Sequence, residues 1–492
     1  MWEERESTKC ETLRISAFEF NIIEMKQVGG MQTYQFDFEH PGKVHFIGIG
    51  GISMSGLAEI LLKDGFAVSG SDMHESEFTE HLQSLGAGIF IGQRAENISW
   101  GPDCAVYTAA IHPDNPEFRA CQEAGIPLLS RAELLGQLMR RYRHAVAVSG
   151  THGKTTTTGM LSHIFLEAKL DPTISIGGVL PLIGSNLRLG GRDTFLLEAC
   201  EYTNSFLSFF PTLEIILNIE ADHLDFFKDL DDIRHSFRRF AERLPENGIL
   251  VISDLIRDYR EIVGDFAGQV ITVGSEQADF YAEDVRYDDT GRPSFIPVER
   301  GQAGERISLS VPGVHNVGNA MAAYAAARSI GVPADEIVRA LGHFGGAERR
   351  FEDKGDLHGV RIVDDYAHHP QEIEATLRAA SLCPHNRIWC VFQPHTYSRT
   401  KALLPEFAEA LSLADRVVLA EIYPARETDT LGVSSGDIAR LINDREPGKA
   451  EAFPDFASIE TFLLEQLEPG DLCITMGAGD IYKVGEELLG RN

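Results

Sequence analysis

Residues 145–158 constrain the fold of this chain more than any other stretch. A short apolar run leads into a turn that holds Gly150 and Gly153, and Lys154 and Thr155 follow at the start of a helix-like segment. Glycines let backbone N–H groups close around phosphate oxygens, and the start of a helix adds positive potential. Lys154 can then reach the terminal phosphates and Thr155 can hold Mg²⁺. The pattern predicts a nucleotide-binding strand, turn and helix.

The spacing departs from the usual phosphate-binding loop. Val148 stands where that pattern has a glycine, five residues before Gly153. An isolated Gly-Lys-Thr can also be an ordinary turn. The apolar run before the turn and the helical stretch after it favour nucleotide binding.

Length and composition bound what the chain can be. Its 492 residues are too many for one ordinary core and suggest about three domains. The formal net charge of −30 argues against nucleic acid or an anionic membrane surface as the main partner. We expect no membrane insertion, because no run of 18 apolar residues and no apolar signal core is present. Seven scattered cysteines without Cys-x-x-Cys spacing favour a reducing, cytoplasmic location.

A second glycine-rich turn follows a predicted strand near residue 43. Gly48 and Gly50 begin a Gly-x-Gly-x-x-Gly pattern, but Ser53 replaces its third glycine. Asp72 ends the next strand at the distance where a dinucleotide-binding fold has its ribose-binding carboxylate. This signal is weak alone, and the alternative is a doubly wound domain in which the glycines serve tight packing.

Polar side chains follow two later predicted strands. The strands near 194–198 and 214–217 end in Glu198, Glu201, Asn218, Glu220, Asp222 and His223. Ligands collect at the carboxyl ends of strands in open α/β sheets, so these side chains are expected beside the phosphate-binding turn. Carboxylate and imidazole suit a divalent metal, although solvated strand ends are the plain alternative for any one of them.

The strand-then-helix pattern continues to the C-terminus. Strands are expected near 360–366, 388–392, 415–421 and 471–476, and a strand-rich insertion or edge sheet between 270 and 311. We therefore predict an α/β protein with three domains: a Rossmann-like N-terminal domain, a central phosphate-loop ATPase domain and a C-terminal α/β domain. The expected divisions are a flexible extension at 1–40 and domains at 41–143, 144–345 and 346–492.

The chain resembles the Mur ligases over nearly everything after residue 40. The resemblance is carried by segments 45–55, 150–156, 218–223, 315–319, 349–351, 364–370 and 392–400. It implies ATP and Mg²⁺ as cofactors, with UDP-N-acetylmuramate and L-alanine as substrates that are joined through an acyl phosphate in peptidoglycan precursor synthesis. The N-terminal domain would bind the UDP part, the central domain ATP and the C-terminal domain the amino acid. Cys200 and Tyr202 depart from a motif of many relatives, so their roles stay open.

The same resemblance implies site residues. Catalysis would fall to Lys154, Glu198, His223, Asn316 and Arg350. ATP would be bound by Gly150, Thr151, His152, Gly153, Lys154, Thr155, Thr156, Asn316, Asn319, Arg350 and Asp365. Substrate would be bound by Gly48, Gly50, Gly51, Ser53, Met54, Ser71, Asp72, His369, His395 and Arg399. The metal ligands would be Thr155, Glu198 and His223.

Three other functions compete with this interpretation. A sister ligase would attach a tripeptide in place of alanine to the same nucleotide sugar. A nicotinamide dehydrogenase would use the first domain, but it leaves Lys154 and the acidic strand ends without a role. A nucleotide-gated binding module would keep the phosphate-binding turn but needs neither paired metal ligands nor the motifs of the third domain.

The first 30 residues are expected to be dispensable. They offer little apolar surface, while ordering each residue costs about 1–2 kcal/mol of backbone entropy. The alternative is an arm packed on the first domain through Phe18, Phe20, Ile22 and Ile23. A chain beginning at Met31 should match the full chain in melting temperature and in ATP-dependent ligation. A clear drop in either would mean that the arm belongs to the fold.

Overall fold

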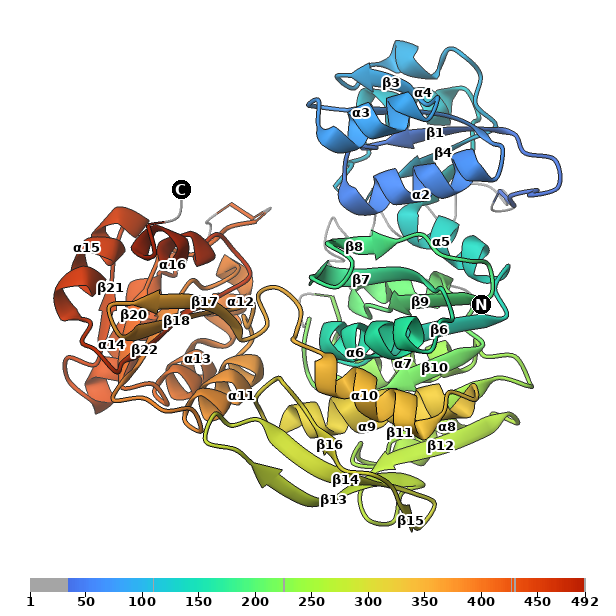
Figure 1. Ribbon diagram of the computed structural model, residues 1–492. Helices are drawn as coiled ribbons and strands as arrows, with labels where there is room; N and C mark the ends of the chain where they lie inside the picture. Colours follow the sequence, from blue (N-terminus) through green and yellow to red (C-terminus); the bar gives the residue numbers. More distant parts are fainter. Residues whose placement is uncertain (1–33, 109, 224–225, 426, 429–430, 491–492) are drawn as a thin grey trace, which may run out of the picture.

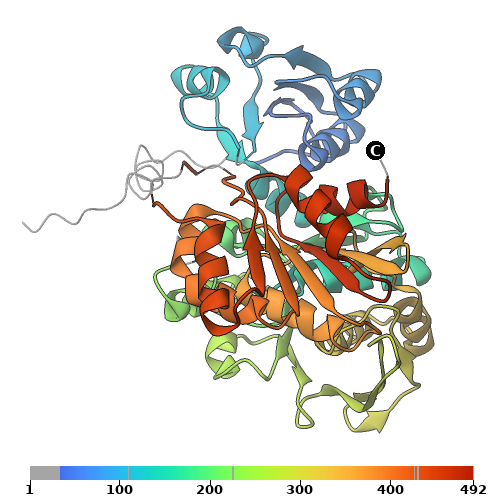
Figure 2. The same ribbon diagram turned by 90° about the vertical axis from the view of Figure 1, so that its left-hand side faces the viewer.

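The computed structural model describes residues 34–108, 110–223, 226–425, 427–428 and 431–490. The arm whose dispensability is predicted above therefore lies outside the described residues. Figure 1 shows three α/β bodies, each built on one sheet. The N-terminal domain lies above the central domain, and Figure 2 shows the C-terminal domain in front of the central one.

The N-terminal domain is a parallel five-stranded sheet in the order β3-β2-β1-β4-β5. This doubly wound order is Rossmann-like, as predicted. Its strands are β1 (Lys43–Ile47), β2 (Ala67–Asp72), β3 (Gly88–Ile91), β4 (Cys104–Tyr107) and β5 (Leu128–Ser130). Its helices are α2 (Ile52–Lys63), α3 (Glu77–Ser84), η1 (Ala95–Ile98), α4 (Pro116–Glu123) and α5 (Arg131–Met139).

Residues 34–38 are attached to this domain, in contrast to the flexible extension expected through residue 40. Phe36 is buried and packs edge-on against Phe66, while Tyr34 and Phe38 contact Phe36. The backbone N–H of Phe36 donates to Gln137 Oε1 at 2.9 Å. Aromatic side chains at alternate positions give this short segment enough apolar surface to offset the entropy of ordering it.

The central domain holds an 11-stranded sheet in the order β15-β14-β13-β12-β11-β10-β6-β9-β7-β8, and β16 pairs with β14. The strands are β6 (His144–Ser149), β7 (Thr173–Leu180), β8 (Ser185–Arg188), β9 (Thr194–Glu198), β10 (Leu213–Ile216), β11 (Ile249–Ser253), β12 (Gln269–Gly274), β13 (Phe280–Tyr287), β14 (Pro293–Glu299), β15 (Gln302–Ala303) and β16 (Ile307–Ser308). The strand-rich segment between 270 and 311 is thus the sheet edge that its sequence predicted.

Helices cover both faces of the central sheet. They are α6 (Lys154–Glu167), η2 (Tyr202–Ser208), α7 (Leu230–Ala241), α8 (Tyr259–Val263), α9 (His315–Ser329) and α10 (Ala334–His343). Helices α6, α9 and α10 share one apolar core with the sheet, and α7 packs on the other face. Because both faces are covered, β6 is a continuous apolar run that delivers the phosphate-binding turn at its carboxyl end.

The C-terminal domain has a six-stranded sheet in the order β17-β18-β22-β19-β20-β21, parallel except for the β17–β18 pair. Its strands are β17 (Glu352–Leu357), β18 (Val360–Asp365), β19 (Ile388–Phe392), β20 (Arg416–Leu419), β21 (Ala450–Ala452) and β22 (Leu472–Met476). Its helices are α11 (Pro370–Ala380), α12 (Tyr397–Ala402), α13 (Leu404–Leu411), α14 (Ser435–Arg445), α15 (Phe456–Gln466) and α16 (Tyr482–Leu488).

The β13–β14 hairpin of the central domain reaches under the C-terminal domain (Figure 1). At its tip, the carbonyl of Thr290 accepts a hydrogen bond from Cys383 Sγ at 3.2 Å. A Cβ added at Gly291 would lie 2.9 Å from Cβ of Leu382. The two domains therefore touch at a place other than the chain crossing near residue 346.

In the parts of the chain that the structure describes, no helix is long and apolar enough to cross a lipid bilayer.

Candidate active site

The turn after β6 has the backbone conformation of a phosphate cradle. Gly150 and Gly153 have φ of 141° and 83°, in the region that side chains disfavour. A Cβ at Gly153 would collide with the side chain of Asn319 on α9. Asn218, at the end of β10, accepts from the N–H of His152 at 2.8 Å and donates to its carbonyl at 3.0 Å. These contacts fix the turn before α6 begins.

Lys154 lies folded against the turn. Its Nζ donates to the carbonyls of Gly150 at 2.6 Å and Thr151 at 3.0 Å, and lies 2.9 Å from Glu201 Oε2. Burial would lower the pKa of Lys154, but the carboxylate of Glu201 raises it overall, so the ammonium stays charged. Glu201 has only 2% of its side chain exposed. A charged lysine is thus held where a nucleotide would present its phosphates.

Thr155 and Glu198 meet beside the turn. Thr155 Oγ1 donates to Glu198 Oε2 at 3.0 Å, and the N–H of Gly177 donates to the same oxygen at 2.8 Å. Among the described residues, no group of three or more His, Cys, Asp and Glu side chains is arranged to hold a metal ion. The pair supplies two adjacent oxygen donors, a set that a hard cation can share with phosphate oxygens and water.

His223 lies beside Glu201. Its ring stacks on Tyr202 with centroids 4.5 Å apart, and its Nε2 is 3.8 Å from Glu201 Oε1. The backbone of His223 has φ of 53°, and its N–H donates to Asp222 Oδ1. A non-glycine residue held in this conformation marks a local constraint of the kind that clusters at functional sites.

A cavity of about 830 Å³ opens between the central and C-terminal domains. The predicted ATP-site residues that line it are His152, Gly153, Thr155, Thr156, Asn316, Asn319, Arg350 and Asp365. Gly150, Thr151 and Lys154 are not among the residues that line it. Asn316 and Asn319 come from the first turns of α9, where Asn319 Nδ2 donates to Asn316 Oδ1 at 3.0 Å.

Asp365 lies at the end of β18, and its carboxylate is held by backbone donors. The N–H groups of Phe351 and Ala367 donate to it at 2.7 and 2.9 Å. Burial raises the pKa of Asp365 to about 6, although Arg350 and these hydrogen bonds act in the opposite direction. The guanidinium of Arg350 lies over the ring of Tyr366, 5.3 Å from its centroid.

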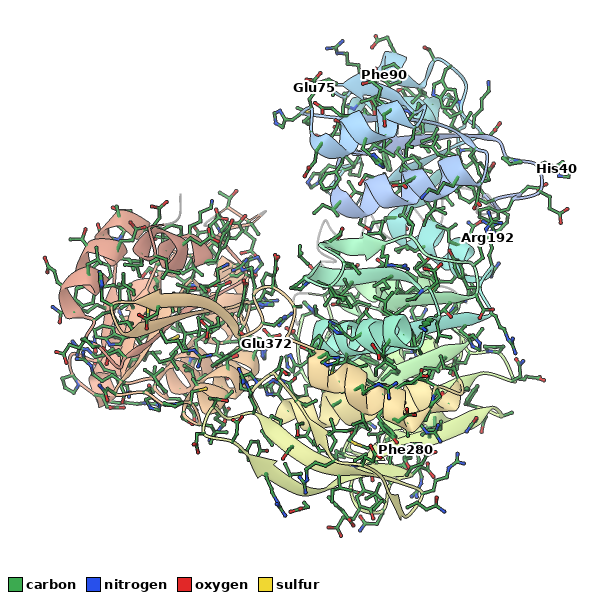
Figure 3. All side chains as sticks on the ribbon, in the orientation of Figure 1. His40, Glu75, Phe90, Arg192, Phe280 and Glu372 are labelled. Carbon is green, nitrogen blue, oxygen red and sulfur yellow. The ribbon has the colours of Figure 1, made fainter. Side chains whose placement is uncertain are left out.

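His152 joins the phosphate-binding turn to the C-terminal domain. Its Nδ1 lies 3.4 Å from Glu372 Oε1, and its Nε2 lies 3.6 Å from Glu220 Oε2. Figure 3 labels Glu372 where the C-terminal domain faces the central one. Burial lowers the pKa of His152, but Glu372 and Glu220 together raise it above its ordinary value. The turn and the start of α11 are therefore in direct contact.

A second contact between these domains involves the residues predicted to face substrate. Arg399 Nη2 lies 3.9 Å from Asp222 Oδ1, and Arg399 Nη1 donates to the carbonyl of His395 at 3.3 Å. Burial lowers the pKa values of His369 and His395, which favours neutral imidazoles. Burial would raise the pKa of Asp222, but His223, His369 and Arg399 lower it overall. This polar cluster lies next to His223.

The predicted sugar-nucleotide residues form a separate group in the N-terminal domain. The N–H groups of Gly48 and of Ile49 donate to the carbonyl of Ser71, and that of Gly50 donates to Asp72 Oδ2 at 2.8 Å. Asp72 Oδ1 accepts from the following backbone N–H, so both oxygens hold the chain itself. Gly51 caps α2 and is exposed.

Two other members of this group do not present their side chains to the turn. Met54 is 2% exposed and packs in the domain core, because it belongs to the apolar stripe of α2. Ser71 is fully buried and lies behind the turn. Each can act there only through its backbone or through a neighbour. Ser53, in contrast, accepts a hydrogen bond from Arg131 Nη1 at 2.9 Å.

Arg131 is a candidate site residue that the sequence pattern did not indicate. It begins α5, and its guanidinium reaches across to the start of α2 while burial lowers its pKa. The sequence signal was a basic residue directly after a short strand, which also fits an ordinary helix start. Only the fold brings this charge to the glycine-rich turn.

These features define a nucleotide-binding α/β protein with a phosphate cradle facing a second domain. Three family models match consecutive parts of the chain: "Mur ligase family, catalytic domain" at 43–143, "Mur ligase middle domain" at 148–327 and "Mur ligase, glutamate ligase domain" at 349–479. The chain belongs to the Mur ligase family.

Within this family, the chain is similar to ligases that act on UDP-N-acetylmuramate. The chain is 57% identical to the UDP-N-acetylmuramate–L-alanine ligase of Lachnospira eligens, over 93% of this chain and 100% of that protein. The crystal structure of the UDP-N-acetylmuramate–alanine ligase of Thermotoga maritima matches with a TM-score of 0.73 at 29% identity, covering 91% and 98% of the two chains. A murein peptide ligase of Psychrobacter arcticus matches with a TM-score of 0.65 at 25% identity, covering 91% and 98%.

Proposed function

We propose that this protein is an ATP-dependent ligase that joins L-alanine to the lactyl carboxylate of UDP-N-acetylmuramate, in the synthesis of peptidoglycan precursors. The observation that carries the proposal is the 57% identity to a UDP-N-acetylmuramate–L-alanine ligase over that relative's whole length. The three-domain architecture and the phosphate cradle support it. Residues 41–143 would bind the sugar nucleotide, 144–345 ATP, and 346–492 alanine.

The chemistry explains why such a ligase uses ATP. A carboxylate is a poor electrophile, so it is first converted to an acyl phosphate: a carboxylate oxygen attacks the γ-phosphorus and ADP leaves. The free amine of alanine then attacks the acyl carbon and inorganic phosphate leaves. Lys154 is the residue that would stabilise charge on the transferring phosphoryl group, since its ammonium is already held at the cradle.

The residues beside the cradle fit a magnesium ion. Thr155 and Glu198 would hold it, because their oxygens are adjacent and Mg²⁺ in nucleotide sites takes few protein ligands besides phosphate and water. His223 would serve a second metal near the carboxylate. Mg²⁺ supplies positive charge that offsets repulsion between phosphate and carboxylate.

The remaining site residues fall into two groups. Asn316, Asn319, Arg350 and Asp365 line the cavity between the domains and would bind the nucleotide. His369, His395 and Arg399 would face the amino acid from the C-terminal domain. Contacts such as Arg399 with Asp222 hold the two domains together around the site, which would keep water from the acyl phosphate.

The function is tested by phosphate release from ATP. We expect release only when UDP-N-acetylmuramate and an amino acid are both present, and fastest with L-alanine among L-alanine, glycine, L-serine and a tripeptide. Release with the tripeptide but not with L-alanine would establish the sister ligase instead. ATP binding without release in any mixture would favour a nucleotide-gated binding module.

A further inference from the structure

A closed polar cluster lies beneath the glycine-rich turn of the N-terminal domain. It joins His45 on β1, Ser69 and Ser71 on β2, Asn97 on η1 and Glu117 on α4. His45, Ser71 and Glu117 are 0% exposed, and Ser69 and Asn97 are 5% and 8% exposed. The cluster therefore connects four elements of the domain and is almost entirely enclosed.

Glu117 is the centre of this cluster. Its Oε2 accepts from Ser71 Oγ at 2.6 Å and lies 3.4 Å from His45 Nε2. Its Oε1 accepts from the N–H of Arg94 at 3.3 Å and from Asn97 Nδ2. Burial would raise the pKa of Glu117, but the hydrogen bonds from His45, Ser71 and Asn97 outweigh it and lower the pKa overall. A carboxylate is thus kept ionised in a dry interior.

A buried charge such as the Glu117 carboxylate adds little to the free energy of unfolding. Well-packed apolar side chains of similar volume are often as stabilising as a buried charged network, which must first repay the cost of desolvation. The clearest other benefit of a satisfied buried network is a single fixed geometry for the elements it joins. The role of Glu117 therefore depends on which elements it holds in place.

Glu117 fixes two loops at the carboxyl end of the sheet. Through Ser71 it holds the end of β2, whose carbonyl at Ser71 accepts the N–H groups of Gly48 and Ile49 in the glycine-rich turn. Through Asn97 it holds the loop after β3, since Asn97 Nδ2 also donates to the carbonyl of Gly92 at 2.9 Å. Ligands of open α/β sheets bind at this end.

We propose that Glu117 is a positioning residue for the sugar nucleotide, acting through Ser71 and Asn97 on the two loops that would contact it. This inference rests on the proposed function, because it takes the N-terminal domain as the sugar-nucleotide site. Glu117 does not reach the substrate itself, since its side chain is enclosed.

The test is Glu117→Gln, which keeps the shape but places an amide donor among groups that already donate. We expect the KM for UDP-N-acetylmuramate to rise about tenfold, while kcat and the KM for ATP stay within twofold. The dissociation constant of UDP-N-acetylmuramate, measured by calorimetry, should rise by the same factor. Glu123→Gln, on the exposed end of the same helix, is the matched control and should change neither.

A purely structural role gives a different result. A lower melting temperature with unchanged KM and dissociation constant would overturn the proposal, as would equal loss for ATP and the sugar nucleotide. If Glu117→Gln does not fold, Asn97→Ala removes one arm of the cluster and should raise the same KM about threefold, and no rise there would count against it.

The binding measurement separates this proposal from the proposed function. A wild type that binds UDP-N-acetylmuramate but does not use L-alanine would refute the ligase assignment and leave the comparison of dissociation constants in force. A wild type that does not bind the sugar nucleotide would overturn both.

Discussion

Replacing Lys154 by alanine is expected to reduce ATP-dependent ligation by about a thousandfold or more, which is the scale of losing a cation at a transferring phosphoryl group. The affinity for UDP-N-acetylmuramate should stay within twofold, because Lys154 lies in the central domain and the sugar nucleotide would bind in the N-terminal one. Phosphate release measures the ligation rate, and calorimetry measures the affinity for UDP-N-acetylmuramate. A marked loss of sugar-nucleotide affinity would contradict this division between domains.

Lys154→Ala should also lower the stability of the fold. Glu201 would remain buried without its partner, and breaking a buried ion pair typically costs about 3–5 kcal/mol. Combining Lys154→Ala with Glu201→Gln should restore much of the melting temperature but none of the turnover. Recovery of turnover in the double variant would mean that the single variant had merely unfolded the site. Lys63→Ala, which breaks an exposed pair with Glu59, is the surface control and should be silent.

The second large effect is expected for His223→Ala. Loss of the imidazole beside Glu201 should lower kcat by about a hundredfold to a thousandfold, corresponding to several kcal/mol of charge stabilisation. Steady-state turnover at saturating substrates measures it. Near-normal turnover at ordinary Mg²⁺ would refute the metal role of His223.

Backbone strain needs its own control in that experiment. His358→Ala is well matched, since His358 has φ of 52° against 53° for His223 and is exposed on the turn between β17 and β18. It should leave kcat unchanged. His223→Asn keeps the backbone conformation, which asparagine tolerates, but its amide does not reach as far as the imidazole. This variant therefore separates loss of the imidazole from release of backbone strain.

Local pattern was sufficient to predict the phosphate-binding turn. An apolar run, two glycines and Lys154 specify a strand, a turn and a helix start within a few residues, and β6 and α6 lie there. Local pattern does not specify the order of the strands in the sheet. The polar ends of β9 and β10 were nevertheless expected to converge. They do so because both strands pair with β6.

Other parts could not be predicted, for reasons that are tertiary. Glu117 is one glutamate in a polar stretch, and no periodicity marks it as buried. Arg131 gains its meaning only when α5 packs near α2. Ser71 and Met54 belong to motif segments, but strand alternation and the apolar stripe of α2 turn their side chains inward. Family motifs identify segments, whereas side-chain direction depends on packing.

The hairpin tip at Thr290 has a mechanical consequence. The C-terminal domain is attached to the central domain by the peptide near Gly346 and, away from it, by the contact of Thr290 with Cys383. Two points of attachment define a line, so we expect any relative movement of the two domains to be a rotation about the line through Thr290 and Gly346. The ion pairs of His152 with Glu372 and of Arg399 with Asp222 also cross the interface between the two domains, and they would oppose such a rotation.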